Sequence, residues 1–425
     1  MKKITSIVII LAIIIVSTLR VCKSGDDAVS EKTERKALPP IDKALQMRTD
    51  SFITNQQHVG SLGLMVYDMT AQKEVYTMNA DKPMRPASCM KLLTCVATLR
   101  KVGTKYNYKT RLYYSGSIVK DTLHGDIILK TQFDPFFNRD SLNVLTAALK
   151  SKNIKAVKGH VILDMAFTEP MDHEQHWTMG DLKVSRMGLI YHGFKKMRTE
   201  TLYSLQNIAG IRSCIDSIRF GRLNTRKGVL IAETKTPILF PVEKALKNSS
   251  NINAESLLYL LGYTVNRNGN FRKNGIIALQ RFVRDELKTN PQKVCNIEDG
   301  CGLCPDDRLS PKLLVSILEY AYHRPKIYDA VFTLLPLSGT DGTLHDRLRK
   351  PNVAGMIKAK TGTLTREGGI STLAGYFKGN DEHLMAFSIM NNECPVMDGR
   401  WWQDRFCEKV FFPKKNTSPK TKAAR

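Results

Sequence analysis

The sequence predicts an α+β protein with a strand-rich insert. Three observations favour this class: a hairpin pattern followed by a helix early in the chain, a middle stretch of short strand-like runs, and helices followed by strand-like runs toward the end. The 425 residues are 42% hydrophobic and 24% charged. This composition is typical of a globular protein and excludes a disordered chain, a collagen-like fibre and a multi-span membrane protein.

The first part of the compact region, 41–103, opens with a hairpin. The runs 62–68 and 74–77 read as its two strands. Apolar residues at helical spacing then predict a helix over 87–101, which Gly103 ends.

The middle stretch, 104–235, has a different residue pattern from the regions on either side and is predicted to be a separate inserted domain. Short strand-like runs alternate there with turns and one helical piece at 142–149. The predicted strands are 110–114, 126–129, 160–163 and 229–233.

The last part, 236–412, belongs with 41–103 in one domain. Its pattern returns to helices and closes with strand-like runs. The predicted helices are 254–261, 275–287, 311–322 and 403–411, and the predicted strands are 356–361, 372–377 and 384–390.

The N-terminal segment differs from the rest. Two lysines precede the apolar run 4–19, a pattern that predicts a secretory signal peptide or an uncleaved anchor within residues 1–22. Lipidation at Cys22 stays an open alternative. We therefore expect an exported bacterial protein, either periplasmic or held at the membrane through residues 4–19 and facing the periplasm.

The two polar end segments are predicted to lie outside the compact domains. Residues 23–40 read as a linker, and residues 413–425 as a basic disordered tail. The formal net charge of +24 raises the idea of nucleic-acid binding. Because the basic residues are scattered and densest in the tail, we expect no nucleic-acid partner and a protein that faces anionic envelope polymers.

Nine cysteines are present, and three of them form a C-x5-C-x2-C cluster at Cys295, Cys301 and Cys304. A zinc site needs a fourth ligand, and no histidine lies nearby in sequence. The cluster therefore predicts a disulfide or buried free thiols, and we expect no metal.

Three short motifs carry the candidate chemistry: SCMK at 88–91, SSN at 249–251 and KTG at 360–362. Each alone has a plainer interpretation, namely a helix cap with a solvated lysine, a cap before the helix at 254–261, and a strand that turns at glycine. Their combination and their order along the chain favour a catalytic site instead.

Ser88 and Lys91 open the predicted helix, where positions i and i+3 are neighbours, so the lysine can reach the serine hydroxyl. The same S-x-x-K spacing recurs at 117–120, but there it falls in a strand-like run, where positions i and i+3 point to opposite faces. The S-x-N pattern likewise recurs at 141–143 and 151–153 without such a context.

Lys91 can accept the serine proton only as a neutral amine, whereas an exposed lysine has a pKa of about 10.4. Burial and a second nearby cation would lower the pKa, and Lys360 is the candidate for that cation. Free backbone N–H groups at the start of the helix would also stabilise an oxyanion on the substrate of Ser88.

These motifs resemble those of the class C low-molecular-mass penicillin-binding proteins, the D-alanyl-D-alanine carboxypeptidase/endopeptidase family. The resemblance covers about residues 45–412. Further matches are Leu123–Asp126, Asp299–Leu303, Gly339–Leu344 and Leu373–Tyr376.

The resemblance implies a penicillin-binding, serine β-lactamase-like transpeptidase fold: an antiparallel sheet covered by helices, with an all-helical cluster. It implies a serine DD-peptidase that hydrolyses the D-Ala-D-Ala bond of peptidoglycan stem peptides through an acyl-enzyme, with the cross-link bond as a further substrate. In this family's mechanism, Ser88 is the nucleophile, Lys91 the general base and Ser249 the proton relay to the leaving amine.

The resemblance also implies the substrate-binding residues. Asn251 binds the peptide and steadies Lys91, and Lys360 and Thr361 hold the terminal carboxylate of the substrate or of a β-lactam. Gly362 and Thr363 complete this strand, and the backbone N–H groups of Thr363 and Ser88 form the oxyanion hole. No metal or organic cofactor is implied.

Two departures and two alternatives remain. Cys301 replaces the family's usual serine, and residues 165–205, with Trp177, match poorly. The alternatives are a serine β-lactamase, which shares the motifs, and an inactive peptidoglycan-binding protein, which keeps the fold alone. The balance of carboxypeptidase and endopeptidase activity stays open.

Overall fold

The computed structural model describes residues 38–166, 168–169, 188–211, 215–222, 228–267, 269–379 and 381–414. The predicted signal peptide or anchor, Cys22, Trp177 and all but the ends of the predicted linker and tail lie outside these residues. Within them, no helix is both long enough and apolar enough to cross a membrane.

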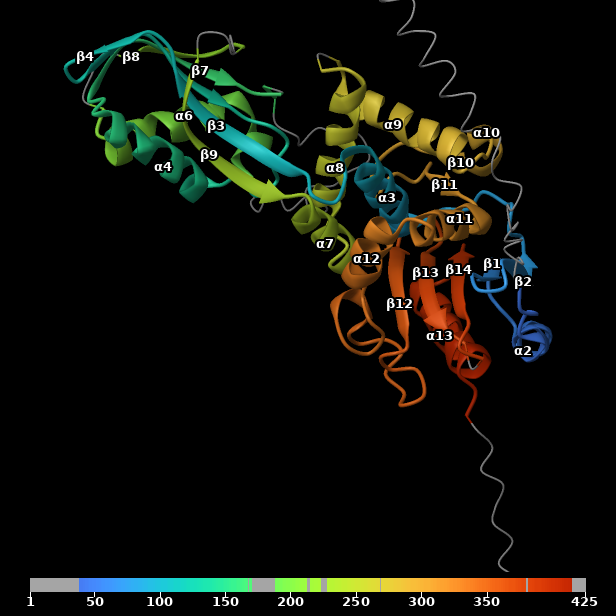
Figure 1. Ribbon diagram of the computed structural model, residues 1–425. Coiled ribbons are helices and arrows are strands. Elements are labelled where there is room, and N and C mark those ends of the chain that lie inside the picture. The colour runs from blue at the N-terminus through green and yellow to red at the C-terminus, as the bar shows by residue number, and fades with distance from the viewer. Residues whose placement is uncertain are drawn as a thin grey trace, which may run out of the picture. The chain divides into compact units, whose positions relative to one another are not determined.

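One sheet joins the two ends of the compact region (Figure 1). It is antiparallel throughout, and its strand order is β12-β13-β14-β1-β2, so the first hairpin of the chain lies beside its last strand. The hairpin and the three late strands predicted from sequence all belong to this sheet. The strands are β1 (Ser61–Asp68), β2 (Lys73–Met78), β12 (Ile357–Leu364), β13 (Ile370–Lys378) and β14 (Leu384–Asn392).

The sheet is covered on both faces, as the alternation along β13 shows. Ala374 and Tyr376 pack into the core shared with the helical cluster, whereas Leu373 and Phe377 pack with the C-terminal helix on the other face. Successive side chains of a strand point to opposite faces. A strand buried on both faces therefore reads as a continuous apolar run, as this one does.

The helical cluster contains the helix that carries Lys91, α3 (Met90–Val102), which follows a 3₁₀ turn at Ala87–Cys89. Gly103, at φ 83°, ends this helix as its sequence predicts. The other helices on this side are α7 (Leu239–Lys247), α8 (Asn251–Val265), α9 (Phe271–Arg281), α10 (Pro291–Val294), α11 (Pro311–Tyr322) and α12 (Pro325–Leu334).

Helix caps explain why two helices begin earlier than the sequence predicted. Ser250 accepts a hydrogen bond from the N–H of Asn253 at the start of α8, and Asn270 does the same for Lys273 in α9. The C-terminal helix α13 (Val396–Phe406) also begins earlier than the predicted start at 403. Helix α2 (Lys43–Asn55), which was not predicted, shares with α13 the core on the outer face of the sheet.

The middle of the chain forms a second, mixed sheet in the order β4-β5-β7-β6-β3-β9, with β8 paired to β7. Its apolar core includes Leu112, Leu129 and Leu163, and Ile252 of α8 also packs into it; the sheet carries α4 (Arg139–Ala147) and α6 (Gly193–Ser204). The strands are β3 (Asn107–Tyr114), β4 (Ser117–Val119), β5 (Thr122–His124), β6 (Ile127–Lys130), β7 (Ala156–Asp164), β8 (Ile215–Phe220) and β9 (Val229–Pro237).

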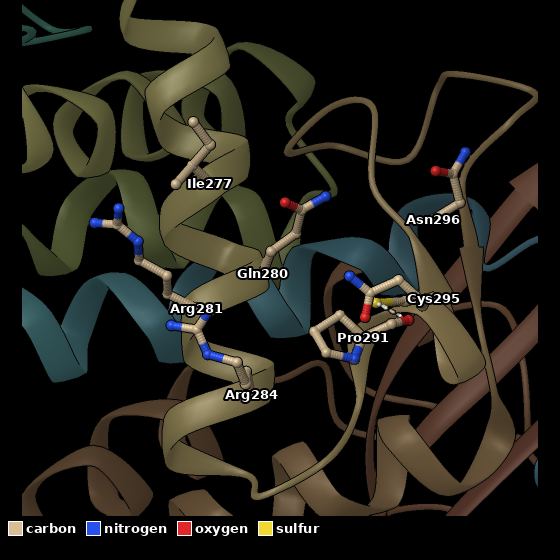
Figure 2. Close-up of a pocket in the computed structure, with 8 residues that line it drawn as sticks. Ile277, Gln280, Arg281, Arg284, Pro291, Cys295 and Asn296 are labelled. Carbon is tan, nitrogen blue, oxygen red and sulfur yellow. Dashed lines mark hydrogen bonds between the residues drawn. The ribbon is translucent and has the colours of Figure 1, made fainter.

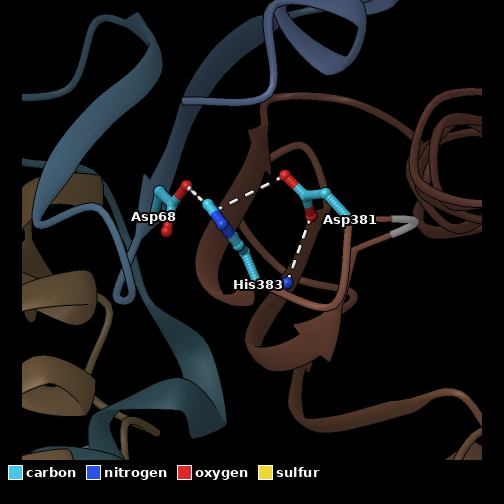
Figure 3. Close-up of side chains that lie close together, drawn as sticks. All are labelled: Asp68, Asp381 and His383. Atoms are coloured by element: carbon cyan, nitrogen blue, oxygen red, sulfur yellow. Dashed lines mark hydrogen bonds and ion pairs between the residues drawn. The ribbon is translucent and has the colours of Figure 1, made fainter. Parts of the chain in front are cut away.

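A buried carboxylate ties two turns of the central sheet together (Figure 3). Asp68, at the end of β1, lies 2.7 Å from His383 Nδ1 through its Oδ2, and Asp381 Oδ2 lies 3.5 Å from the same ring nitrogen. The other oxygen of Asp68 accepts the backbone N–H groups of Thr70 and Ala71. The hydrogen bond to Asp68 raises the pKa of His383.

This pair predicts a stability difference that depends on pH. The protonated form of His383 is favoured in the folded state, so its contribution is fully present below the unfolded pKa of about 6.5 and is lost as pH rises through the raised folded pKa. We expect His383→Gln to lower the free energy of unfolding by about 1 kcal/mol at pH 5 and by less at pH 9. Urea unfolding at both pH values measures it, with the exposed His58→Gln as control. Equal losses at the two pH values would contradict a role for the charge.

Candidate active site

The structure brings the three motifs together around one amine. Lys91 Nζ lies 2.8 Å from Ser88 Oγ, 2.9 Å from Asn251 Oδ1 and 2.7 Å from the carbonyl oxygen of Cys301. Ser88 sits in the 3₁₀ turn that leads into α3, so the lysine one turn later stands beside it. Asn251 comes from the first position of α8.

The surroundings of Lys91 suit the neutral form of its amine. The side chain is completely buried, and this burial lowers its pKa. A neutral amine has two N–H donors and one lone pair. The donors match the oxygens of Asn251 and Cys301, which leaves the lone pair facing the hydroxyl of Ser88. The amine can therefore accept the serine proton without losing its other contacts.

A second buried amine lies on the same face of the sheet. Lys360 Nζ lies 3.0 Å from Ser249 Oγ and 2.6 Å from the carbonyl oxygen of Thr361. Burial, and then the positive charge of Lys91, lower the pKa of Lys360 to about 7. Ser249 has φ 57°, a left-handed backbone that serine rarely adopts and that costs about 1 kcal/mol or more.

Strand β12 offers an open edge beside Ser88. At its start, the N–H of Ala359 points outward and donates to Pro336 O at 3.1 Å. Backbone groups alternate along a strand, so the N–H groups of Thr361 and Thr363 point to the same edge. Gly362 lets the Ser88 turn pack closely, because a Cβ there would lie 2.5 Å from Pro86 O.

A fourth segment holds the carbonyl that contacts Lys91. The carboxylate of Asp299 accepts the backbone N–H groups of four successive residues, and both of its oxygens accept two each. Gly302, at φ 80°, brings this loop against the turn that carries Ser88, since a Cβ there would lie 1.9 Å from Ala87 O. The donors are Cys301, Gly302, Leu303 and Cys304.

Two further acids surround Asp299. Glu255 Oε1 accepts the N–H of Gly300 at 2.7 Å, and burial together with the negative charge of Asp299 raises the pKa of Asp307 well above its ordinary value. Glu255, Asp299 and Cys301 bring potential metal-ligand atoms within 4.8 Å of one another. Because backbone donors already engage the oxygens of Asp299, we assign this cluster to holding the loop.

The predicted cysteine cluster consists of free thiols. Cys295, Cys301 and Cys304 form no disulfide with one another, and the same holds for the other described cysteines. Burial raises the pKa of Cys301 well above its ordinary value, so its thiol stays neutral. The exchange of serine for cysteine leaves the contact with Lys91 in place, because that contact uses the backbone carbonyl.

The other sequence candidates lie elsewhere. Ser117 is in the exposed strand β4, and Lys120 follows it at φ 58°. Asn143 accepts a hydrogen bond from Ser204 in the region of the second sheet, and Asn153 ends a 3₁₀ helix there. None of them contacts the cluster around Lys91 in the described part of the chain.

A pocket of about 550 Å³ lies between α9 and the segment at 291–296 (Figure 2). Arg281 and Arg284 line it, together with Cys295, whose Sγ donates to Pro291 O and whose pKa burial raises to about 11. Arg284 is already paired with Asp285. None of the residues around Lys91 lines this pocket, so it is separate from the candidate active site.

Sequence reasoning missed the groups that act through the backbone or from distant loops. The carbonyl of Cys301 could not be predicted, because any residue type supplies one. Thr343, whose Oγ1 lies 2.7 Å from Thr361 Oγ1, was noted only as part of a matching glycine-rich segment. Gly300 and Gly302, on either side of Cys301, were the feature of the sequence that could have indicated a tightly held loop.

This fold and a serine beside a buried lysine define the serine acyl-transferring hydrolases of the penicillin-binding class. The D-Ala-D-Ala carboxypeptidase 3 (S13) family matches residues 45–189 and 202–406. The chain belongs to this family of serine D-alanyl-D-alanine carboxypeptidases, which confirms the membership that the motifs predicted.

Individual relatives agree with this assignment. The chain is 21% identical to the D-alanyl-D-alanine carboxypeptidase DacB of Haemophilus influenzae, over 79% of this chain and 86% of that protein. The crystal structure of penicillin-binding protein 4 from the same organism matches with a TM-score of 0.72 at 19% identity, over 86% of this chain and 99% of that one. Its β-lactam complex matches with a TM-score of 0.68 at 18% identity, with the same coverage. These matches confirm the predicted penicillin-binding fold.

The Asp299 loop yields a prediction for Asp299→Asn. The amide keeps one oxygen and turns its NH₂ group toward backbone donors, so buried N–H groups lose their acceptor. We expect a loss of at least about 2 kcal/mol in the free energy of unfolding, together with slower acylation by a fluorescent penicillin. Urea unfolding and labelling rates measure both effects. The exposed neighbour Asp306→Asn is the control, and equal behaviour of the two variants would contradict the role given to Asp299.

Proposed function

We propose that this chain hydrolyses the bond between the two terminal D-alanines of peptidoglycan stem peptides through an acyl-enzyme on Ser88. The observation that carries the proposal is the buried amine of Lys91, 2.8 Å from Ser88 Oγ. A serine is a weak nucleophile until a base removes its proton, and a desolvated amine in contact with it is such a base.

Acylation begins when Lys91 takes the proton of Ser88 and Oγ attacks the substrate carbonyl carbon. The backbone N–H of Ser88 and that of Thr363 on the open edge of β12 hold the resulting oxyanion. The carbon–nitrogen bond then breaks, and the proton passes through Ser249 to the leaving amine. Lys360, 3.0 Å from Ser249 Oγ, steadies this relay.

Binding places the substrate along β12. Asn251 binds the peptide side of the substrate and keeps Lys91 in place. Lys360 and Thr361 hold the terminal carboxylate, and Gly362 keeps β12 close to the turn that carries Ser88. Water then attacks the ester of Ser88 and releases the shortened peptide. A β-lactam enters the same steps and leaves a long-lived acyl group.

The substrate sets where the enzyme acts. Stem peptides with terminal D-alanines belong to the bacterial cell wall, so we propose an exported protein that works in the periplasm. The predicted signal peptide or anchor in residues 1–22 supports this location. Cross-linked peptides present a similar bond next to a D-centre, which makes the endopeptidase reaction the second activity to test.

Purified muropeptides test the proposed reaction. We expect loss of one alanine from pentapeptide stems, read by mass spectrometry, and resolution of dimers if the cross-link is also cut. Ser88→Ala should abolish both reactions and covalent labelling by a fluorescent penicillin, because no acyl-enzyme can form. Persistent labelling of Ser88→Ala would exclude this nucleophile. An unchanged muropeptide profile with a labelled wild-type enzyme would exclude the substrate.

The role of Lys91 predicts a pH profile. Only the neutral amine accepts a proton, so the acylation rate of the wild type should fall as pH drops through the lowered pKa of Lys91. Lys91→Ala should lose about 100-fold or more of this rate, while the exposed Lys101→Ala on the same helix should not. Stopped-flow labelling between pH 5 and 9 measures the rates. Acylation of Lys91→Ala at the wild-type rate would remove its role as base.

A further inference from the structure

The far end of β12 meets a cation from the C-terminal helix. Arg400 Nη2 donates to Thr363 Oγ1 at 3.0 Å. Within the described residues, no carboxylate lies at ion-pair distance from Arg400, whereas its neighbour Arg347 is paired with Asp404 at 2.6 Å. The Nε of Arg400 is buried and has no hydrogen-bond partner there. Arg400 is thus a partly buried cation without an ion pair in the described part of the chain, because Asp404, the carboxylate that acts on it electrostatically, is paired with Arg347.

The direction of the β12 side chains explains how Arg400 reaches this site. Ile357 and Ala359 pack into the core on the α13 face of the sheet. By alternation, Thr361 and Thr363 point to that face, while Lys360 points to the opposite one. A substrate along the open edge of β12 is therefore reached from two sides, by Lys360 from the helical cluster and by the threonines from the α13 side.

The charge supplied by Lys360 is limited. Burial lowers the pKa of this amine to about 7, so its positive charge is disfavoured relative to an exposed lysine. Its amine is also engaged with Ser249 and with the carbonyl of Thr361. A guanidinium stays charged at every working pH. Arg400 therefore provides a constant positive charge at the end of β12 beyond Lys360.

We propose that Arg400 is a specificity-determining residue for the free carboxylate of the amino acid that leaves, and that it acts through Thr363. The proposal rests on the proposed DD-peptidase function. The oxygen of Thr363 accepts from the guanidinium, which leaves the hydroxyl proton to donate to a carboxylate. A hydrogen bond to an ionised carboxylate is stronger than one to a neutral amide, so the arrangement favours free acids over amides.

Two substrates that differ only at the C-terminus test this inference. One is a diacetylated L-Lys-D-Ala-D-Ala peptide with a free acid, and the other is the same peptide with a C-terminal amide. We expect Arg400→Gln to lower kcat/KM for the acid by about tenfold to a hundredfold, mainly through KM, and to change the amide by less than about threefold. Arg400→Lys should restore part of the selectivity for the acid.

The control is Arg405→Gln, the same exchange on the same helix, where Arg405 lies over Trp401. It should leave the ratio of acid to amide unchanged. An unchanged ratio in Arg400→Gln, or equal losses on both substrates, would overturn the inference. A wild-type enzyme that cleaves neither peptide would instead overturn the proposed function, so the two failures are distinguishable.

Discussion

The burial of one lysine amine is the constraint on which the rest of the site depends. Lys91 has no exposed surface, and its amine is surrounded by Ser88, Asn251 and the carbonyl of Cys301. An ammonium group in this position loses its hydration, so the neutral form gains relative to the charged form. The contacts come from three separate segments of the chain, and these segments must therefore pack together before the proposed base can reach the serine. Stability and the proposed chemistry are coupled here, because the packing that stabilises the domain also favours the neutral form of Lys91.

The acids near Lys91 act mainly by holding backbone. Asp299 does not touch the amine in the described contacts, yet it fixes the loop whose carbonyl does. Asp307 lies beside it, and burial together with the charge of Asp299 raises its pKa, which disfavours a second full negative charge there. An additional carboxylate in direct contact would favour the ammonium form and oppose the function of Lys91 as a base. The use of a neutral carbonyl as the third partner avoids that effect.

Much of the fold and of the motif set could be predicted from the sequence, for reasons that particular residues show. The helix of Lys91 has apolar spacing and a terminal glycine, and the late strands have continuous apolar runs, so local pattern and tertiary burial agree. Helix α2 was missed because its apolar pattern is weak, and α7 because Pro241, which stands in its first turn, reads as a break in the pattern. The motif residues could be chosen because their order is specific. Arg400, Thr343 and the carbonyl of Cys301 could not, since they meet the site only after distant segments pack together.

The pairing of β1 with β14 has a consequence for how the protein acquires its structure. Ser61 pairs with Asn392, so the first strand of the sheet has its partner near the other end of the chain. The central sheet cannot close until its C-terminal strands have been synthesised, because β1 pairs with β14. Premature termination before β14 would leave β1 with an unpaired edge, a surface prone to aggregation. The central sheet beside Ser88 is therefore completed only after β14 has been made.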